Sequence, residues 1–117
     1  MTKQETRLCN LIRDRLKRDY GIHLHKNWGG VFTETGAADL YGTLPGGRAV
    51  YFELKTPEGS KRKSGRAAYQ KAWLAREEKM GALTGVVAMY AEVQLKLESA
   101  GIYPHRQIKK SDIESIS

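Results

Sequence analysis

At 117 residues, with 40% hydrophobic and 28% charged residues, the chain has the size and composition of one globular domain with a single core. Its apolar runs are far shorter than the about 20 residues of a membrane span, and no signal-peptide core follows Met1. The single cysteine, Cys9, cannot form an intrachain disulfide, so we expect a cytoplasmic protein that does not contact a membrane.

The net charge is +7, and the excess of positive charge is concentrated in one part of the chain. Between Arg48 and Arg76 the only acidic residues are Glu53 and Glu58. The basic residues of this segment are Arg48, Lys55, Lys61, Arg62, Lys63, Arg66, Lys71 and Arg76. This asymmetry favours a polyanionic partner, because each neutralised phosphate releases counterions. On composition alone, a basic surface that only aids solubility is an equally good interpretation.

Residues 2–20 are predicted to form the first helix. Thr2 and Glu5 fit a capping box at its start, and Gly21 is a suitable left-handed residue at its end. Apolar residues recur at helical spacing along it, namely Leu8, Leu11, Ile12 and Leu16. We expect Cys9 to pack on this helix as a small apolar residue.

The next part of the chain has the shorter period of strands. Segments 26–34 and 39–44 are predicted strands, interrupted by glycines. Pro45 and Gly46 occupy the central positions of a predicted type II turn, so a hairpin should lead into a strand at 48–55. A polar, basic loop is expected from 58 to 65.

A second helix is predicted over 66–80, opening at Ser64 or Gly65 and ending at Gly81. The apolar run 84–90 is typical of a central strand buried on both faces, and 91–101 is a short helix or a further strand, of which we favour the helix. The order α-β-β-β-α-β predicts an α/β fold in which a mixed sheet of about four strands is flanked by helices. We expect one domain over 1–117, with a core at about 2–90 and a C-terminal extension at about 91–117.

The predicted hairpin brings two carboxylates together. Asp39 begins one strand, Glu53 lies on the next, and same-face residues of adjacent strands are about 5 Å apart. Two neighbouring carboxylates favour a bound cation, and Mg²⁺ is commonly held by one or two carboxylates with phosphate and water. The Leu54 carbonyl could add an oxygen ligand. Lys55, on the same face as Glu53, could stabilise negative charge on a phosphate.

Each candidate residue also has a structural interpretation. Glu53 and Lys55 could be a solvated ion pair on an outer sheet face, worth less than ~1 kcal/mol. Gln70 should turn inward with its helix, toward a site or simply toward backbone partners. Glu5 is fully explained by the capping box. The basic loop residues Lys61, Arg62, Lys63 and Arg66 could hold a nucleic-acid backbone or form a solvated charge run; their place beside the carboxylates favours DNA contact.

The motifs "GAADLYG", "GGRAVYFELKTPEG" and "YQKAW" resemble the virus-type replication-repair nuclease (VRR-NUC) branch of the PD-(D/E)XK nuclease superfamily, over about residues 2–90. The resemblance implies a restriction-endonuclease-like core in which Asp39, Glu53 and the Leu54 carbonyl bind Mg²⁺, with Mn²⁺ as a substitute. It implies that Lys55 serves the attacking water and that Gln70 and Glu5 belong to the site. One departure is Ala38, which stands where the superfamily has its naming proline.

The resulting prediction is a metal-dependent DNA endonuclease that hydrolyses phosphodiester bonds. The resemblance points to structured DNA, such as branched junctions or flaps, and to a homodimer that pairs two active sites. The alternative is a non-catalytic nucleic-acid-binding module that keeps the same fold. A structural partner in a larger replication or packaging assembly is a third possibility.

Overall fold

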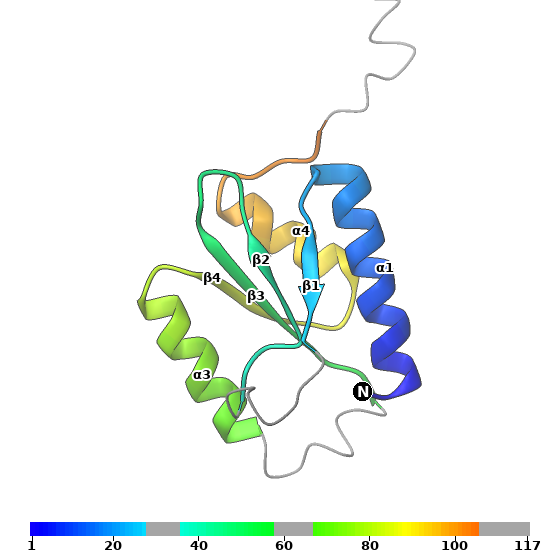
Figure 1. Ribbon diagram of the computed structural model, residues 1–117, viewed down its shortest axis with the longest axis vertical. Helices are drawn as coiled ribbons and strands as arrows, with labels where there is room; N and C mark the ends of the chain where they lie inside the picture. Colours follow the sequence, from blue (N-terminus) through cyan, green and yellow to red (C-terminus); the bar gives the residue numbers. More distant parts are fainter. Residues whose placement is uncertain (28–35, 58–66, 106–117) are drawn as a thin grey trace, which may run out of the picture.

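Four strands form one mixed sheet, with helices on both of its faces (Figure 1). The computed structural model describes residues 1–27, 36–57 and 67–105. In chain order the elements are α1 (Lys3–Tyr20), β1 (Leu24–Lys26), β2 (Leu40–Thr43), β3 (Ala49–Leu54), α3 (Ala67–Lys79), β4 (Leu83–Val87) and α4 (Tyr90–Ser99). The predicted α/β class with a four-stranded mixed sheet is confirmed.

Helix α1 begins and ends at the residues that the capping signals predict. The Thr2 hydroxyl oxygen accepts a hydrogen bond from the Glu5 N–H at 3.1 Å, which satisfies one of the free donors of the first turn. At the other end Gly21 has a φ of 66°, and its N–H caps the last carbonyls. Cys9 lies fully buried on the inner face of this helix, as predicted.

The central hairpin joins β2 to β3 through the predicted turn. The Gly47 N–H donates to the Leu44 carbonyl at 3.0 Å, and Gly46 has a φ of 92°, as a type II turn requires at that position. β2 pairs antiparallel with β1 and with β3, whereas β3 pairs parallel with β4 after the crossover through α3. Of the predicted strand 26–34, residues 28–34 lie outside the described part of the chain; the observed strand β1 begins earlier, at Leu24, and ends at Lys26.

The two faces of the sheet are covered differently. One face carries the main core under α1 and α4, with buried strand residues Leu24, Leu40, Val50, Phe52, Leu54, Leu83 and Val87. The opposite face packs against α3, which contacts β4 and lies on the β4 side of the sheet (Figure 1). Because side chains alternate along a strand, Tyr51 and Glu53 point to this second face.

The prediction of β4 as a central strand buried on both faces is wrong. β4 lies at one end of the strand order among the described residues, whereas β2 and β3 have neighbours on both sides. Leu83 and Val87 are buried on the core face, but Val86 is 53% exposed on the other. The apolar run therefore reflects one buried face and a partly covered edge. The segment that follows is a helix, α4, as favoured from the sequence.

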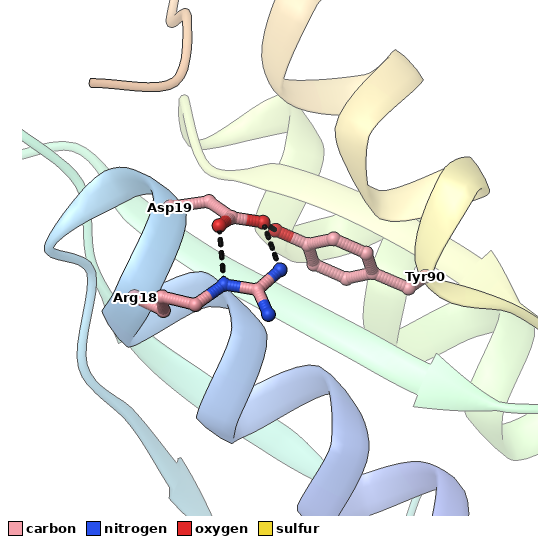
Figure 2. Close-up of polar contacts among 3 residues, drawn as sticks. All are labelled: Arg18, Asp19 and Tyr90. Atoms are coloured by element: carbon pink, nitrogen blue, oxygen red, sulfur yellow. Dashed lines mark hydrogen bonds and ion pairs between the residues drawn. The ribbon is translucent and has the colours of Figure 1, made fainter. Parts of the chain in front are cut away.

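A polar cluster ties the end of α1 to the start of α4 (Figure 2). The Tyr90 hydroxyl donates to Asp19 Oδ2 at 2.8 Å, and the Arg18 guanidinium donates to both oxygens of the same carboxylate, at 2.6 and 3.0 Å. Burial, with the hydrogen bond to Asp19, raises the pKa of Tyr90. None of the helices in the described ranges is long and apolar enough to cross a membrane.

Candidate active site

Asp39 lies opposite Glu53, at the end of the hairpin that faces away from its turn. Leu40 pairs with Phe52 in the antiparallel register, so the next pair outward is Asp39 with Glu53. The Asp39 carboxylate accepts a hydrogen bond from the Leu54 N–H at 2.9 Å, and its main-chain carbonyl accepts one from the Asn27 N–H at 2.8 Å. Asp39 is thus held between β1 and β3, next to the residue that follows Glu53, while the predicted approach of the two carboxylates stays a prediction.

Glu53 is a buried carboxylate, only 4% exposed, on the sheet face that packs against α3. The Gln70 side-chain amide donates to Glu53 Oε1 at 2.7 Å. A buried charge is costly unless hydrogen bonds or ions compensate it, and this bond supplies part of that compensation. The inward orientation predicted for Gln70 is therefore observed, and its partner is the carboxylate of the predicted site.

Lys55 and Leu54 lie at the end of β3, directly after Glu53. The Lys55 N–H continues the ladder to β4 by donating to the Val87 carbonyl at 2.8 Å, and its side chain is exposed. The ion pairs found within the described ranges are Arg18–Asp19 and Arg76–Glu77, so Lys55 is not a salt-bridge partner of Glu53 there. In an extended strand the N–H and C=O of one residue face the same neighbour. We therefore expect the Leu54 carbonyl to face the side on which its N–H meets Asp39.

Glu5 lies on the inner face of α1, where it is buried in the first turn. The Thr2 hydroxyl contacts its Oε1 at 3.3 Å, in addition to the main-chain cap. One turn further along the same face is Cys9, whose thiol pKa is raised, chiefly by burial. One half of the predicted capping box, in which the Thr2 hydroxyl accepts from the Glu5 N–H, is thus observed, whereas the Glu5 carboxylate contacts the Thr2 hydroxyl. Its participation in a site stays a prediction.

Gly36 and Asn27 position Asp39, and their roles were not recognised from the sequence. Gly36 has a φ of 86° and packs so closely on α3 that a Cβ there would lie 2.6 Å from the Tyr69 carbonyl oxygen and 3.1 Å from the Gln70 nitrogen. The Asn27 amide donates to the Ala38 carbonyl at 3.1 Å. The sequence signal for Gly36 was its place three residues before Asp39, whereas Asn27 lay inside the predicted strand 26–34 and carried no signal; the partners of both residues are distant in sequence.

The donor set suits a hard divalent cation. Asp39 and Glu53 offer carboxylate oxygens and Leu54 a carbonyl oxygen, which are the ligand types that Mg²⁺ and Mn²⁺ prefer. Within residues 1–27, 36–57 and 67–105, no group of three or more His, Cys, Asp or Glu side chains gathers as a metal cluster. Two carboxylates agree with the usual Mg²⁺ site, in which substrate phosphate and water complete the coordination. The residues present therefore fit such an ion.

Comparisons with protein-family models, with curated proteins and with solved structures found no match to this chain. The resemblance to the VRR-NUC branch therefore rests on the quoted motifs, and it stays a prediction. The predicted DNA-contacting residues Lys61, Arg62, Lys63 and Arg66 lie outside the described part of the chain.

Proposed function

We propose that the protein is a divalent-metal-dependent endonuclease that hydrolyses phosphodiester bonds in branched or otherwise structured DNA. The observation that carries this proposal is the buried Glu53, whose carboxylate accepts from Gln70, next to Asp39, whose carboxylate accepts from the Leu54 N–H. A solvated surface pair would need neither burial nor a dedicated amide partner from another element. Such an arrangement is typical of a site that is held ready for a ligand.

Each residue has a separate role in the proposed reaction. Asp39, Glu53 and the Leu54 carbonyl would hold Mg²⁺ or Mn²⁺, which when bound supplies Lewis-acid polarisation of the phosphate and lowers the pKa of a water. Gln70 keeps one Glu53 oxygen engaged at 2.7 Å and so restricts the rotation of the carboxylate. Lys55, with its exposed side chain, offsets negative charge that develops on the phosphate during attack.

The rival function is a nucleic-acid-binding module without catalysis. The net charge of +7 supports DNA binding in both cases and does not separate them. The separating observable is cleavage in Mg²⁺ or Mn²⁺ of plasmid, hairpin, flap and four-way-junction DNA. If no substrate is cut although DNA is bound, the endonuclease proposal fails and the binding module stands.

Two substitutions test the site itself, each with a matched control. Glu53→Gln and Lys55→Ala should abolish cutting, while binding at low salt largely survives, because they remove a ligand charge and a phosphate-stabilising charge. Glu78→Gln and Lys79→Ala make the same chemical changes at exposed positions near the end of α3 and should cut normally. Activity that persists in both site variants would show that the site is assigned to the wrong residues.

A further inference from the structure

Three aromatic side chains lie in register across three neighbouring strands. Tyr41 of β2 pairs directly with His25 of β1 and with Tyr51 of β3. Directly paired residues project to the same face, about 4.5–5.5 Å apart. The rings of His25 and Tyr41 have centroids 5.3 Å apart with planes 35° apart. These three residues, which we name the aromatic row, cross the sheet face opposite the main core.

The aromatic row is open to solvent over β1 and β2. Tyr41 is 43% exposed and His25 is exposed, whereas Tyr51 is half-buried because Trp73 of α3 packs edge-on against it at 4.8 Å. This agrees with the position of α3 on the β4 side of the sheet (Figure 1). Cross-strand pairing of the rings stabilises the sheet, and the exposure of Tyr41 and His25 leaves their rings accessible to a ligand.

The aromatic row adjoins the candidate active site. Asp39 lies directly before β2, and extending the register by one residue places it opposite Glu53, each two residues from Tyr41 and Tyr51 respectively. Two residues of a strand span about 6.6–6.8 Å. This distance is close to the spacing of successive phosphates in an extended nucleic-acid strand, so a base on the row would have a neighbouring phosphate near the carboxylates.

The charges around the aromatic row complement a polyanion. The guanidinium of Arg76 lies 6.0 Å from the centroid of the Trp73 ring, and this ring packs against Tyr51. The exposed Lys55 follows Glu53 at the end of β3, and the chain as a whole carries +7. Proteins that bind single strands without sequence preference combine aromatic rings, on which bases stack, with nearby cations that bind phosphates.

We propose that the aromatic row binds unpaired bases of single-stranded DNA by stacking and places the adjoining phosphate at the Asp39–Glu53 pair. The stacking of bases is argued from the aromatic row alone, whereas the placement of the phosphate at the carboxylates rests on the proposed function. Duplex DNA keeps its bases stacked on one another, so its binding depends on the cations and not on the row. The row therefore selects DNA that has an unpaired segment.

Binding is measured by the fluorescence anisotropy of a labelled oligothymidylate in EDTA, where no metal-dependent cutting occurs. Tyr41→Ala should weaken binding by about tenfold, as expected for the loss of one stacked base. Tyr41→Phe, which keeps the ring, should bind nearly as wild type. Tyr103→Ala removes a tyrosine that is 64% exposed away from the row, and it should have no effect. A labelled duplex should lose far less affinity than the single strand in Tyr41→Ala.

His25→Ala gives a second variant at the exposed end of the row, and it should also weaken single-strand binding. The inference is overturned if both alanine variants fold, as judged by thermal unfolding, and bind the oligothymidylate as tightly as wild type. Equal losses for single strand and duplex would overturn it as well. If binding depends on Tyr41 but wild type cuts nothing in Mg²⁺, the aromatic row stands and the nuclease proposal fails. If the Tyr41→Ala protein binds the oligothymidylate as tightly as wild type and still cuts DNA, the aromatic-row proposal fails and the nuclease proposal stands.

Discussion

Gly36→Ala should damage the candidate site through the contact between the Asp39 loop and α3. Gly36 lies three residues before Asp39, and a Cβ there would lie 2.6 Å from the Tyr69 carbonyl oxygen, about 0.8 Å closer than the 3.4 Å at which ordinary contact begins. The obstructing atoms belong to the backbone of α3 and cannot turn away as a flexible side chain would. Either the loop or the first turn of α3 has to move.

The expected cost has two parts. A φ of 86° is strained for alanine by about 1 kcal/mol, and forcing a methyl group into packed backbone costs about 1–3 kcal/mol. The sum of about 2–4 kcal/mol is less than the stability of most domains, so the variant should still fold. A displacement near 0.8 Å would stretch the 2.7 Å bond between Gln70 and Glu53 to the limit of hydrogen bonding. Metal-dependent cleavage should therefore fall although the protein is folded.

Gly46→Ala is the matched control. Gly46 has a φ of 92°, but a Cβ there would meet nothing within 4 Å, so only the backbone strain of about 1 kcal/mol applies. Urea unfolding should give a loss for Gly36→Ala that exceeds the control by about 1–3 kcal/mol, and only Gly36→Ala should lose cleavage. The reasoning is refuted if the two variants lose equal stability and both cut DNA as wild type does.

The remaining predictions concern the cluster of Figure 2 and use urea unfolding across pH. Tyr90→Phe removes the 2.8 Å bond to Asp19 and should cost about 1 kcal/mol, because Arg18 still compensates the carboxylate. The Arg18 hydrogen bond lowers the pKa of Asp19, so its stabilisation is complete above pH about 4 and is lost as pH falls further; Asp19→Asn should flatten this decline. Burial raises the pKa of Tyr90, so its stabilisation is complete below pH about 10 and is lost at higher pH, a decline that Tyr90→Phe should lack. If Asp19→Asn loses stability at low pH as wild type does, the role of Asp19 is contradicted. If Tyr90→Phe loses stability at high pH as wild type does, the role of Tyr90 is contradicted.

Local signals made much of the site predictable. The turn at Pro45–Gly46 fixed the hairpin, and strand alternation then placed Glu53 on the face opposite Phe52. Given that register, the approach of Asp39 to Glu53 followed. Gln70 followed from helical spacing, since it lies on the same side of α3 as the buried Leu74. These predictions needed only contacts between neighbouring segments or the period of one element.

The parts that were missed depend on contacts across the whole fold. An apolar run such as that of β4 has the same pattern in a central strand and in an edge strand with one buried face, so its place in the sheet was not determined. Gly36 has an ordinary loop sequence around it, and only the approach of α3 shows why a side chain is excluded. The aromatic row required the register of β1 against β2, and β1 ends at Lys26, where the sequence predicted that a strand begins.

The same core register holds the candidate site and the aromatic row in place. Leu40 and Phe52 pair on the buried face, between the pair Tyr41–Tyr51 on one side and the pair Asp39–Glu53 on the other. A slip of one residue would turn every side chain to the opposite face, which would bury the rings and remove the carboxylates from each other. The apolar packing under α1 and α4 thus fixes the distance between the aromatic row and the carboxylates. In the two proposals, the selection of unpaired DNA and its cleavage are therefore set by one hairpin, and a shift of its register would change both together.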